Sequence, residues 1–150
     1  MRIFDSLLEL RQAAGEELGV TEWVPIEQER VTGFAQVTED RQWIHVDEAT
    51  ASHSSYGGTI AHGFLTLSLV PFLLRQLYRV DEVRMAMNYG LDKVRFPSVT
   101  RVGSRVRGSA KISEVVPLDK AVQVAFEVTV TAEGEEKPAC VATYIVRFVE

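Results

Sequence analysis

The segment 57–78 constrains the fold most, because its second part is apolar on almost every side. A surface helix carries a single apolar stripe, so a helix that is apolar on most faces must be buried on most faces. The segment is shorter than the roughly 20 apolar residues that cross a membrane, and Pro71 interrupts it. We therefore predict a core helix over 64–78, with a kink or break at Pro71. Its large apolar residues are Phe64, Leu65, Leu67, Leu69, Val70, Phe72, Leu73, Leu74 and Leu77.

Three glycines precede or open this helix, at Gly57, Gly58 and Gly63, and His62 lies beside the last of them. The beginning of a helix offers unpaired N–H groups and a partial positive charge. Glycine there lets another molecule approach the backbone. One interpretation is a tight turn that requires glycine. The other is a site that stabilises a developing oxyanion beside a histidine. The spacing alone leaves both open.

Length and charge exclude several classes of protein. The 150 residues suffice for one domain, 1–150, with a core that needs no disulfide or metal to fold. The single cysteine, Cys140, lies in an apolar run and is expected to be a core residue, which fits a reducing compartment. The net charge of −5 argues against a nucleic-acid binder. With no signal peptide in view, we expect a cytoplasmic protein with no nucleic-acid and no membrane partner.

Before the core helix, the sequence pattern predicts mainly short helices and loops. In chain order we expect a helix over 3–14, a short strand over 21–26, a helix over 27–38, a loop over 39–46, a short helix over 47–52 and a loop over 53–56. Asp47 begins the short helix, because its carboxylate can accept hydrogen bonds from the free N–H groups there.

After Val80 the apolar period changes from helical to alternating. We expect strands over 84–96, 105–112, 122–131 and 139–149, with turns over 115–120 and 132–138. Strands joined by short turns form an antiparallel meander, and the core helix can cover its apolar face. The last strand is apolar on both faces, so it is central or lies at a subunit contact. The pattern predicts an α+β fold, a curled antiparallel sheet around one apolar helix.

Asp40 and His45 form the clearest candidate for chemistry. Both groups can exchange protons near neutral pH, so a paired aspartate and histidine can hold and activate a water molecule. The two residues lie five apart in the predicted loop, where their side chains can converge. The same spacing is more often a helix cap followed by a surface histidine. From the spacing alone, both interpretations stay open.

Three segments together resemble the MaoC-like, (R)-specific enoyl-CoA hydratase family of hot-dog-fold proteins. They are 40–47, 59–66 and 88–96, and the resemblance covers most of 20–149. The family motif runs D-x-N-P-[ILV]-H, followed by A-H-G and an apolar helix. Gln42 stands where the family usually has Asn, and Trp43 where it has Pro. Proline would fix one dihedral angle of the loop, so Trp43 leaves the loop freer unless its ring packs.

The resemblance implies a mechanism as well as a hot-dog domain. Asp40 and His45 would hold the water that adds to a trans-2-enoyl thioester, giving an (R)-3-hydroxyacyl thioester reversibly. The backbone N–H of Gly63 would stabilise the enolate-like charge. The reaction would need no metal and no redox cofactor. The sequence does not indicate which of the two groups is the base.

Other residues receive supporting roles in this hypothesis. His62 is expected to orient the loop through a hydrogen bond to backbone, and Gln42 and Trp43 to support the loop or line the substrate site. Three arginines, Arg95, Arg105 and Arg107, are candidates to contact the phosphates of coenzyme A or an acyl carrier protein, although such residues usually form a solvated face. The resemblance also implies a homodimer in which the coenzyme A arm touches both chains.

Three alternatives stay open at this point. The first is a (3R)-hydroxyacyl dehydratase of fatty-acid synthesis, which runs the same chemistry backwards on an acyl carrier protein. The second is a hot-dog acyl-CoA thioesterase, which needs no double bond in its substrate. The third is a non-catalytic subunit that only binds acyl chains, and the presence of both Asp40 and His45 argues against it. The sequence does not define the acyl chain length.

Overall fold

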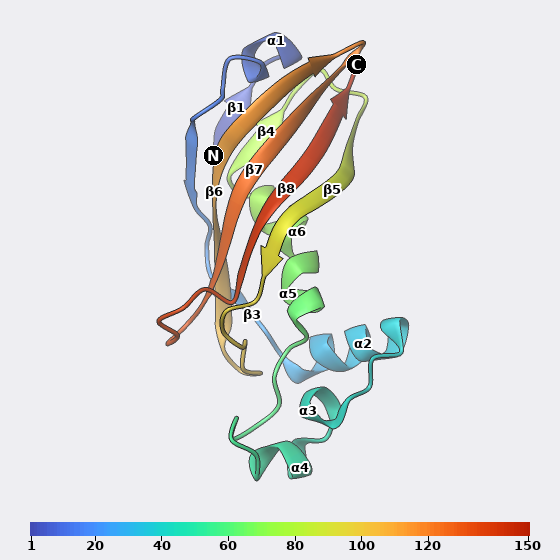
Figure 1. Cartoon of the computed structure of the whole chain (residues 1–150), viewed down its shortest axis with the longest axis vertical. Helices are drawn as coiled ribbons and strands as arrows, with labels where there is room; N and C mark the ends of the chain where they lie inside the picture. Colours follow the sequence, from blue (N-terminus) through green and yellow to red (C-terminus); the bar gives the residue numbers. More distant parts are fainter.

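A computed structural model describes residues 1–150. Six strands form one antiparallel sheet in the order β2-β6-β7-β8-β5, with β3 pairing beside β2 on β6 (Figure 1). The bounds are β2 Glu17–Val20, β3 Val24–Pro25, β5 Met85–Arg95, β6 Arg105–Leu118, β7 Ala121–Ala132 and β8 Cys140–Val149. The predicted meander holds for the last three strands only. β5 pairs with β8, so the chain crosses to the other edge of the sheet before β6 begins.

Alternation of side chains gives the sheet one buried face. Along β7 the residues Val122, Val124, Phe126 and Val130 are fully buried, and the residues between them are mostly half-buried. β8 shows the same alternation, with Tyr144 among its buried residues. A strand places successive side chains on opposite faces, so this period follows directly from the sequence. β8, the last strand, lies inside the sheet between β7 and β5. Of the two expectations for this strand, a central position or a subunit contact, the central position is confirmed.

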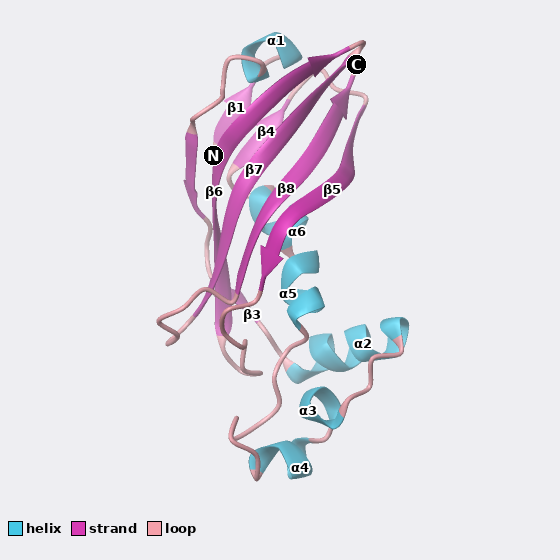
Figure 2. Ribbon diagram, viewed as in Figure 1, coloured by secondary structure: helices cyan, strands magenta, loops and turns pink.

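The core helix lies against the concave face of this sheet (Figure 2). It is broken in two, as α5 (Gly63–Ser68) and α6 (Val70–Leu74), and the predicted break near Pro71 is confirmed. Proline has no N–H to donate to the preceding turn, and it is accepted where a new helix starts. The helix ends earlier than the predicted residue 78, because Tyr78 belongs to β4 (Tyr78–Val80).

The expectation of burial on most faces is wrong for two residues of this helix. Phe64 is 69% exposed and Phe72 is 49% exposed, whereas Leu65, Leu73 and Leu74 are buried. The sheet covers only one side of α5 and α6, so the apolar residues on the other side stay largely exposed. The ring of Phe64 has that of Phe96 as a neighbour, with centroids 6.0 Å apart. An apolar surface of this kind marks a site for a ligand or another protein.

Two further predictions about the elements need correction. The predicted helix 3–14 is a strand, β1 (Arg2–Phe4), followed by one helical turn, α1 (Leu7–Leu10). β1 pairs with β4 in parallel, and Ser6 caps α1 by accepting the N–H of Glu9. The predicted turn 115–120 is mostly strand, because β6 continues to Leu118 and pairs with β7 to that point.

Three helices extend beyond one end of the sheet (Figure 1). They are α2 (Gln28–Thr38), α3 (Trp43–Val46) and α4 (Glu48–Ser52). The predicted helix 27–38 is confirmed, and so is the cap of α4, since the Asp47 carboxylate accepts the N–H of Thr50. The predicted loop 39–46 is wrong in its second half, which forms α3. No helix of the structure has the length and apolar character needed to cross a membrane.

Candidate active site

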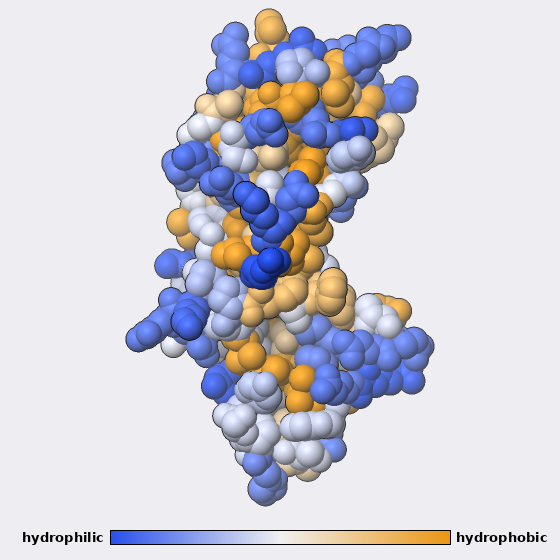
Figure 3. Space-filling view, viewed as in Figure 1, coloured by the Kyte–Doolittle hydropathy of each residue, from blue (hydrophilic) through white to orange (hydrophobic).

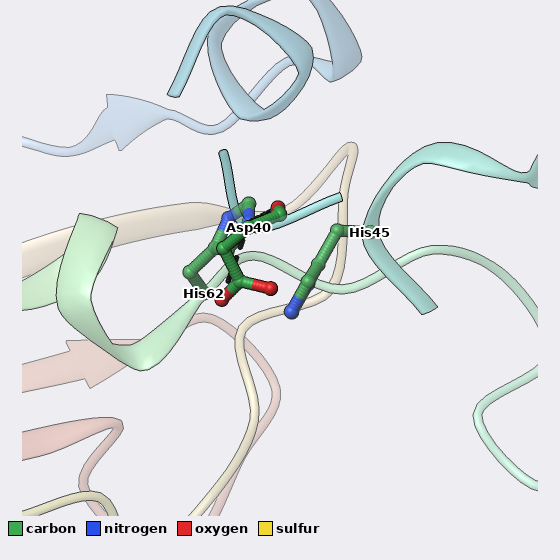
Figure 4. Close-up of side chains that lie close together, drawn as sticks. All are labelled: Asp40, His45 and His62. Carbon is green, nitrogen blue, oxygen red and sulfur yellow. Dashed lines mark hydrogen bonds and ion pairs between the residues drawn. The ribbon is translucent and has the colours of Figure 1, made fainter. Parts of the chain in front are cut away.

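Asp40 and His45 approach each other where α2 gives way to α3. Helix α2 ends at Thr38, and the left-handed conformation of the next residue, Glu39 (φ 62°), turns the chain sharply toward Asp40. One turn later His45 projects from α3. Figure 4 shows the Asp40 carboxylate and a ring nitrogen of His45 directed into the same space. The Asp40 side chain is 55% exposed, whereas His45 is buried, so the pair joins a solvated acid to a sheltered imidazole.

The hydrogen bonds of His45 define which nitrogen faces the site. Its Nδ1 lies 2.7 Å from the carbonyl oxygen of Ile60. A carbonyl can only accept, so Nδ1 carries the proton and Nε2 presents a free lone pair. Burial lowers the pKa of His45, and the neighbouring His62 lowers it further, against opposing effects of the Ile60 carbonyl and Asp40. The imidazole is therefore neutral near neutral pH and can accept a proton.

His62 contacts both members of the pair. Its Nε2 donates to the backbone carbonyl of Asp40 at 2.9 Å, which is the kind of backbone hydrogen bond expected from the sequence. Its ring stacks on that of His45, with centroids 3.7 Å apart and planes inclined by 21°. The other side of the ring packs against Phe34, at 5.0 Å between centroids.

Gly63 opens α5 directly after His62. Its N–H makes no hydrogen bond within the chain, as expected at the first position of a helix that lacks a side-chain cap. A Cβ atom at this position would lie 2.9 Å from the ring of Phe96, closer than such contacts occur. Only glycine fits between the helix start and that ring. His62 therefore connects the two parts of the site. Its ring contacts Asp40 and His45, and the free N–H belongs to the next residue, Gly63.

The ligand atoms of Asp40, His45 and His62 lie within 4.8 Å of one another, a spacing that a metal site could share. The contacts of the ring nitrogens do not favour a metal. Nδ1 of His45 donates to the carbonyl of Ile60, and Nδ1 of His62 is buried within the protein. The Nε2–H of His62 is also engaged with a carbonyl. The cluster fits a bound water and proton transfer better.

The remaining predicted site residues are placed as follows. Gln42 and Trp43 begin α3, and both are exposed. Trp43 stands at the first position of α3, a position that proline favours because its fixed φ angle suits a helix. Here the helix itself restrains that dihedral angle. Its ring is exposed, so the alternative of a well-packed anchor does not hold within this chain.

The three arginines are not brought together. Arg95 ends β5, next to Phe96 and so close to Gly63. Arg105 and Arg107 lie on β6, which is separated from β5 by β7 and β8, on the face opposite the helix. Arg105 is paired with Glu133, and Arg107 lies over the ring of Trp23 at 4.5 Å. Of the three, Arg95 alone adjoins the site.

Several supporting residues escaped the sequence analysis. Gln28 donates to the carbonyl of His45 at 2.8 Å and accepts the hydroxyl of Thr59 at 2.5 Å, which ties α2 to α3 and to the approach to α5. Ile60 fixes the tautomer of His45. Phe34 lies within the predicted helix 27–38. None of these residues carries reactive chemistry, so only a view of the folded chain could identify them.

An apolar cavity of about 500 Å³ adjoins the site, between α5 and β5. Figure 3 shows apolar side chains gathered at the narrow middle of the molecule. Phe34, which touches His62, forms part of the cavity wall, and so does Phe64, which follows Gly63. The wall consists of Phe34, Phe64, Leu67, Ser68, Val70, Pro71, Asn88, Tyr89, Gly90, Leu91 and Tyr144.

Comparison with known proteins identifies the family. The MaoC-like domain matches residues 9–134. The chain is 51% identical to 3-hydroxyacyl-thioester dehydratase Z of Mycobacterium tuberculosis over 150 residues, with 99% of each chain covered.

Two solved structures share the fold. The monoamine oxidase regulatory protein from Archaeoglobus fulgius superimposes with a TM-score of 0.78 at 23% identity, covering 99% of this chain and 97% of that one. R-hydratase PhaJ1 from Pseudomonas aeruginosa gives a TM-score of 0.70 at 20% identity, covering 91% of this chain and 82% of that one. The chain therefore belongs to the MaoC-like family, has its hot-dog fold and is an enzyme of the hydro-lyase class.

Proposed function

We propose that the protein catalyses the reversible hydration of trans-2-enoyl-CoA to (R)-3-hydroxyacyl-CoA. The observation that supports this most is the meeting of a solvated carboxylate and a neutral imidazole beside His62, the residue directly before a free helix-opening amide. The motif resemblance and the family suggest the same chemistry. The relative named 3-hydroxyacyl-thioester dehydratase Z fits the reverse direction of this reaction.

In the proposed reaction the thioester carbonyl accepts the N–H of Gly63. A water molecule lies between the Asp40 carboxylate and Nε2 of His45. Its oxygen bonds to C3, one of its protons passes to the Asp40–His45 pair, and the pair returns one proton to C2. Charge accumulates on the thioester oxygen as the C3–O bond forms. Removing one such oxyanion donor typically costs about 2.7–4 kcal/mol of transition-state stabilisation.

The apolar cavity is the natural place for the acyl chain. It begins beside Phe64, one residue after the proposed oxyanion site, and continues between α5 and β5. At its far side the hydroxyl of Tyr144 donates to the Asn88 side chain. Burial raises the pKa of Tyr144, so the hydroxyl stays protonated and can keep that bond. Short and medium chains would lie on the near side of this polar pair.

The coenzyme A arm is proposed to leave the site past Arg95. This arginine is exposed at the end of β5 and adjoins Phe96, which packs on Gly63. Guanidinium groups bind phosphate oxygens well. Arg105 is already neutralised by Glu133 on the far face, which makes it a weaker candidate.

A direct assay tests the function. The purified protein alone should remove the enoyl absorbance of crotonyl-CoA and release (R)-3-hydroxybutyryl-CoA, with no free thiol formed. Release of free thiol from saturated and unsaturated acyl-CoA alike would identify a thioesterase. Binding of acyl-CoA without turnover would identify a non-catalytic subunit. Either result would overturn the proposal.

The physiological carrier needs a separate comparison. Crotonyl groups on coenzyme A and on an acyl carrier protein should be hydrated with different kcat/KM values. A clear preference for coenzyme A supports the proposal. A strong preference for the carrier protein would favour the dehydratase of fatty-acid synthesis.

A further inference from the structure

The imidazole of His62 is the most deeply enclosed polar group beside the proposed catalytic pair, at 3% exposure. It makes one hydrogen bond, from Nε2 to the backbone carbonyl of Asp40 at 2.9 Å, and one face-to-face contact, with His45 at 3.7 Å. We propose that His62 is a positioning residue that fixes the backbone of Asp40 and the ring plane of His45 in a single arrangement. This inference rests on the proposed function.

The unused nitrogen of His62 supports a specific role for the ring. Because Nε2 donates to a carbonyl, Nδ1 is the unprotonated nitrogen, and it is buried with no hydrogen-bond partner. Burying an acceptor without a partner costs free energy, which a phenyl ring at the same place would avoid. The Nε2–H group distinguishes the imidazole from such a ring, because it donates to the Asp40 carbonyl and lies 4.0 Å from the Asp40 carboxylate.

Stacking couples the two rings electrically as well as sterically. The ring of His62 lies face to face with that of His45, with centroids 3.7 Å apart. The groups that face His45 are His62, the Asp40 carboxylate and the Ile60 carbonyl. Of these, His62 alone lowers the pKa of His45, in addition to burial. His62 therefore helps to keep Nε2 of His45 free to accept a proton.

Two substitutions separate the two contacts. His62→Phe keeps an aromatic ring for stacking but removes the donor to Asp40. His62→Gln keeps an N–H donor at a similar reach but removes the ring. A matched control is His53→Gln, because His53 is an exposed histidine in the loop after α4. Circular dichroism and thermal unfolding establish that each variant is folded.

We expect both variants to lower kcat for crotonyl-CoA hydration by about 10- to 100-fold with little change in KM, since small misplacements of catalytic groups have effects of this size. The acid limb of the pH–rate profile should move to higher pH, because His62 no longer lowers the pKa of His45. His53→Gln should change neither. If His62→Phe does not fold, His62→Gln decides the outcome.

A lowered melting temperature with an unchanged kcat per folded molecule and an unchanged acid limb would show a purely structural role and overturn the inference. The titration of His45 followed by NMR gives a readout that needs no turnover. Its pKa should rise in both His62 variants, and an unchanged pKa would also count against the inference. If the wild-type protein is inactive but the pKa of His45 rises in both His62 variants, the proposed function is refuted and the effect of His62 on His45 is retained.

Discussion

Gly63 is held to glycine by a neighbour and not by its backbone conformation. A Cβ atom there would meet the ring of Phe96 at 2.9 Å, so Gly63→Ala must displace the ring or the start of α5. We expect kcat to fall by about 10²-fold, the effect of a shift of about 1 Å in a catalytic group. The measurement is crotonyl-CoA hydration by the folded variant.

Gly58 provides the control for this substitution, because a Cβ atom there has nothing within 4 Å. Gly58→Ala should therefore keep most of the activity. Adding Phe96→Leu to Gly63→Ala should restore part of the loss by making room. If Gly63→Ala is as active as the wild type, the contact with Phe96 does not hold this amide in its place.

His45 should make the stability of the protein depend on pH. Burial lowers its pKa in the folded state, whereas the unfolded chain titrates near about 6.5. Below about 6.5 the unfolded state binds a proton that the folded state does not, so stability falls as pH decreases toward the folded pKa. Urea unfolding from pH 8 to pH 5 measures this effect. The wild type should lose more stability over that range than His45→Gln, and equal losses would contradict the assignment.

At the level of residues, the sequence indicated the groups that we propose to react and missed the residues that support them. Asp40, His45 and Gly63 occur in the order of the family motif. An aspartate, a histidine and a glycine at the start of a helix are residue types whose chemistry can be inferred from sequence. The stacking of His62 on His45, and the hydrogen bond from His45 to Ile60, join residues that no spacing rule relates. These contacts depend on how the approach to α5 lies across α3.

At the level of elements, α6 and β6 pack closely enough to need a glycine. A Cβ atom on Gly108 would lie 3.3 Å from the side chain of Leu73. Gly108→Val should force the helix away from the sheet and destabilise the protein by about 1–3 kcal/mol, the usual range for overpacking. Thermal and urea unfolding measure the change. Ser109→Val, on the opposite face of the same strand, should have a small effect.

Strand periodicity predicted the sheet well, and helix periodicity was less reliable. β7 was predicted almost to its bounds because its alternation is continuous. The N-terminal segment has helical spacing, yet β1 pairs with β4, a partner far away in the chain. Long-range pairing of this kind overrides local preference. The exposure of Phe64 and Phe72 was missed because an apolar helix does not reveal how much of its circumference the sheet covers.

At the level of the whole molecule, the exposed edge of the sheet predicts a homodimer. β5 is an edge strand with large apolar residues in the open: Met85, Met87, Tyr89 and Leu91. Such an edge is normally paired or covered. Sedimentation at micromolar concentration should show a dimer, and Met87→Lys should weaken it. Thr129→Lys, on the outer face of β7, is the control. A monomeric wild type would contradict this prediction.

The central claim is that Asp40 and His45 act together on one water molecule. The most direct test is the kcat of crotonyl-CoA hydration by folded Asp40→Asn, His45→Gln and the double variant. Each single substitution should lower kcat by about 10²–10⁴-fold. The double variant should be little slower than the slower single one, because residues that act as a unit are not additive. A folded single variant with the wild-type rate would contradict the account.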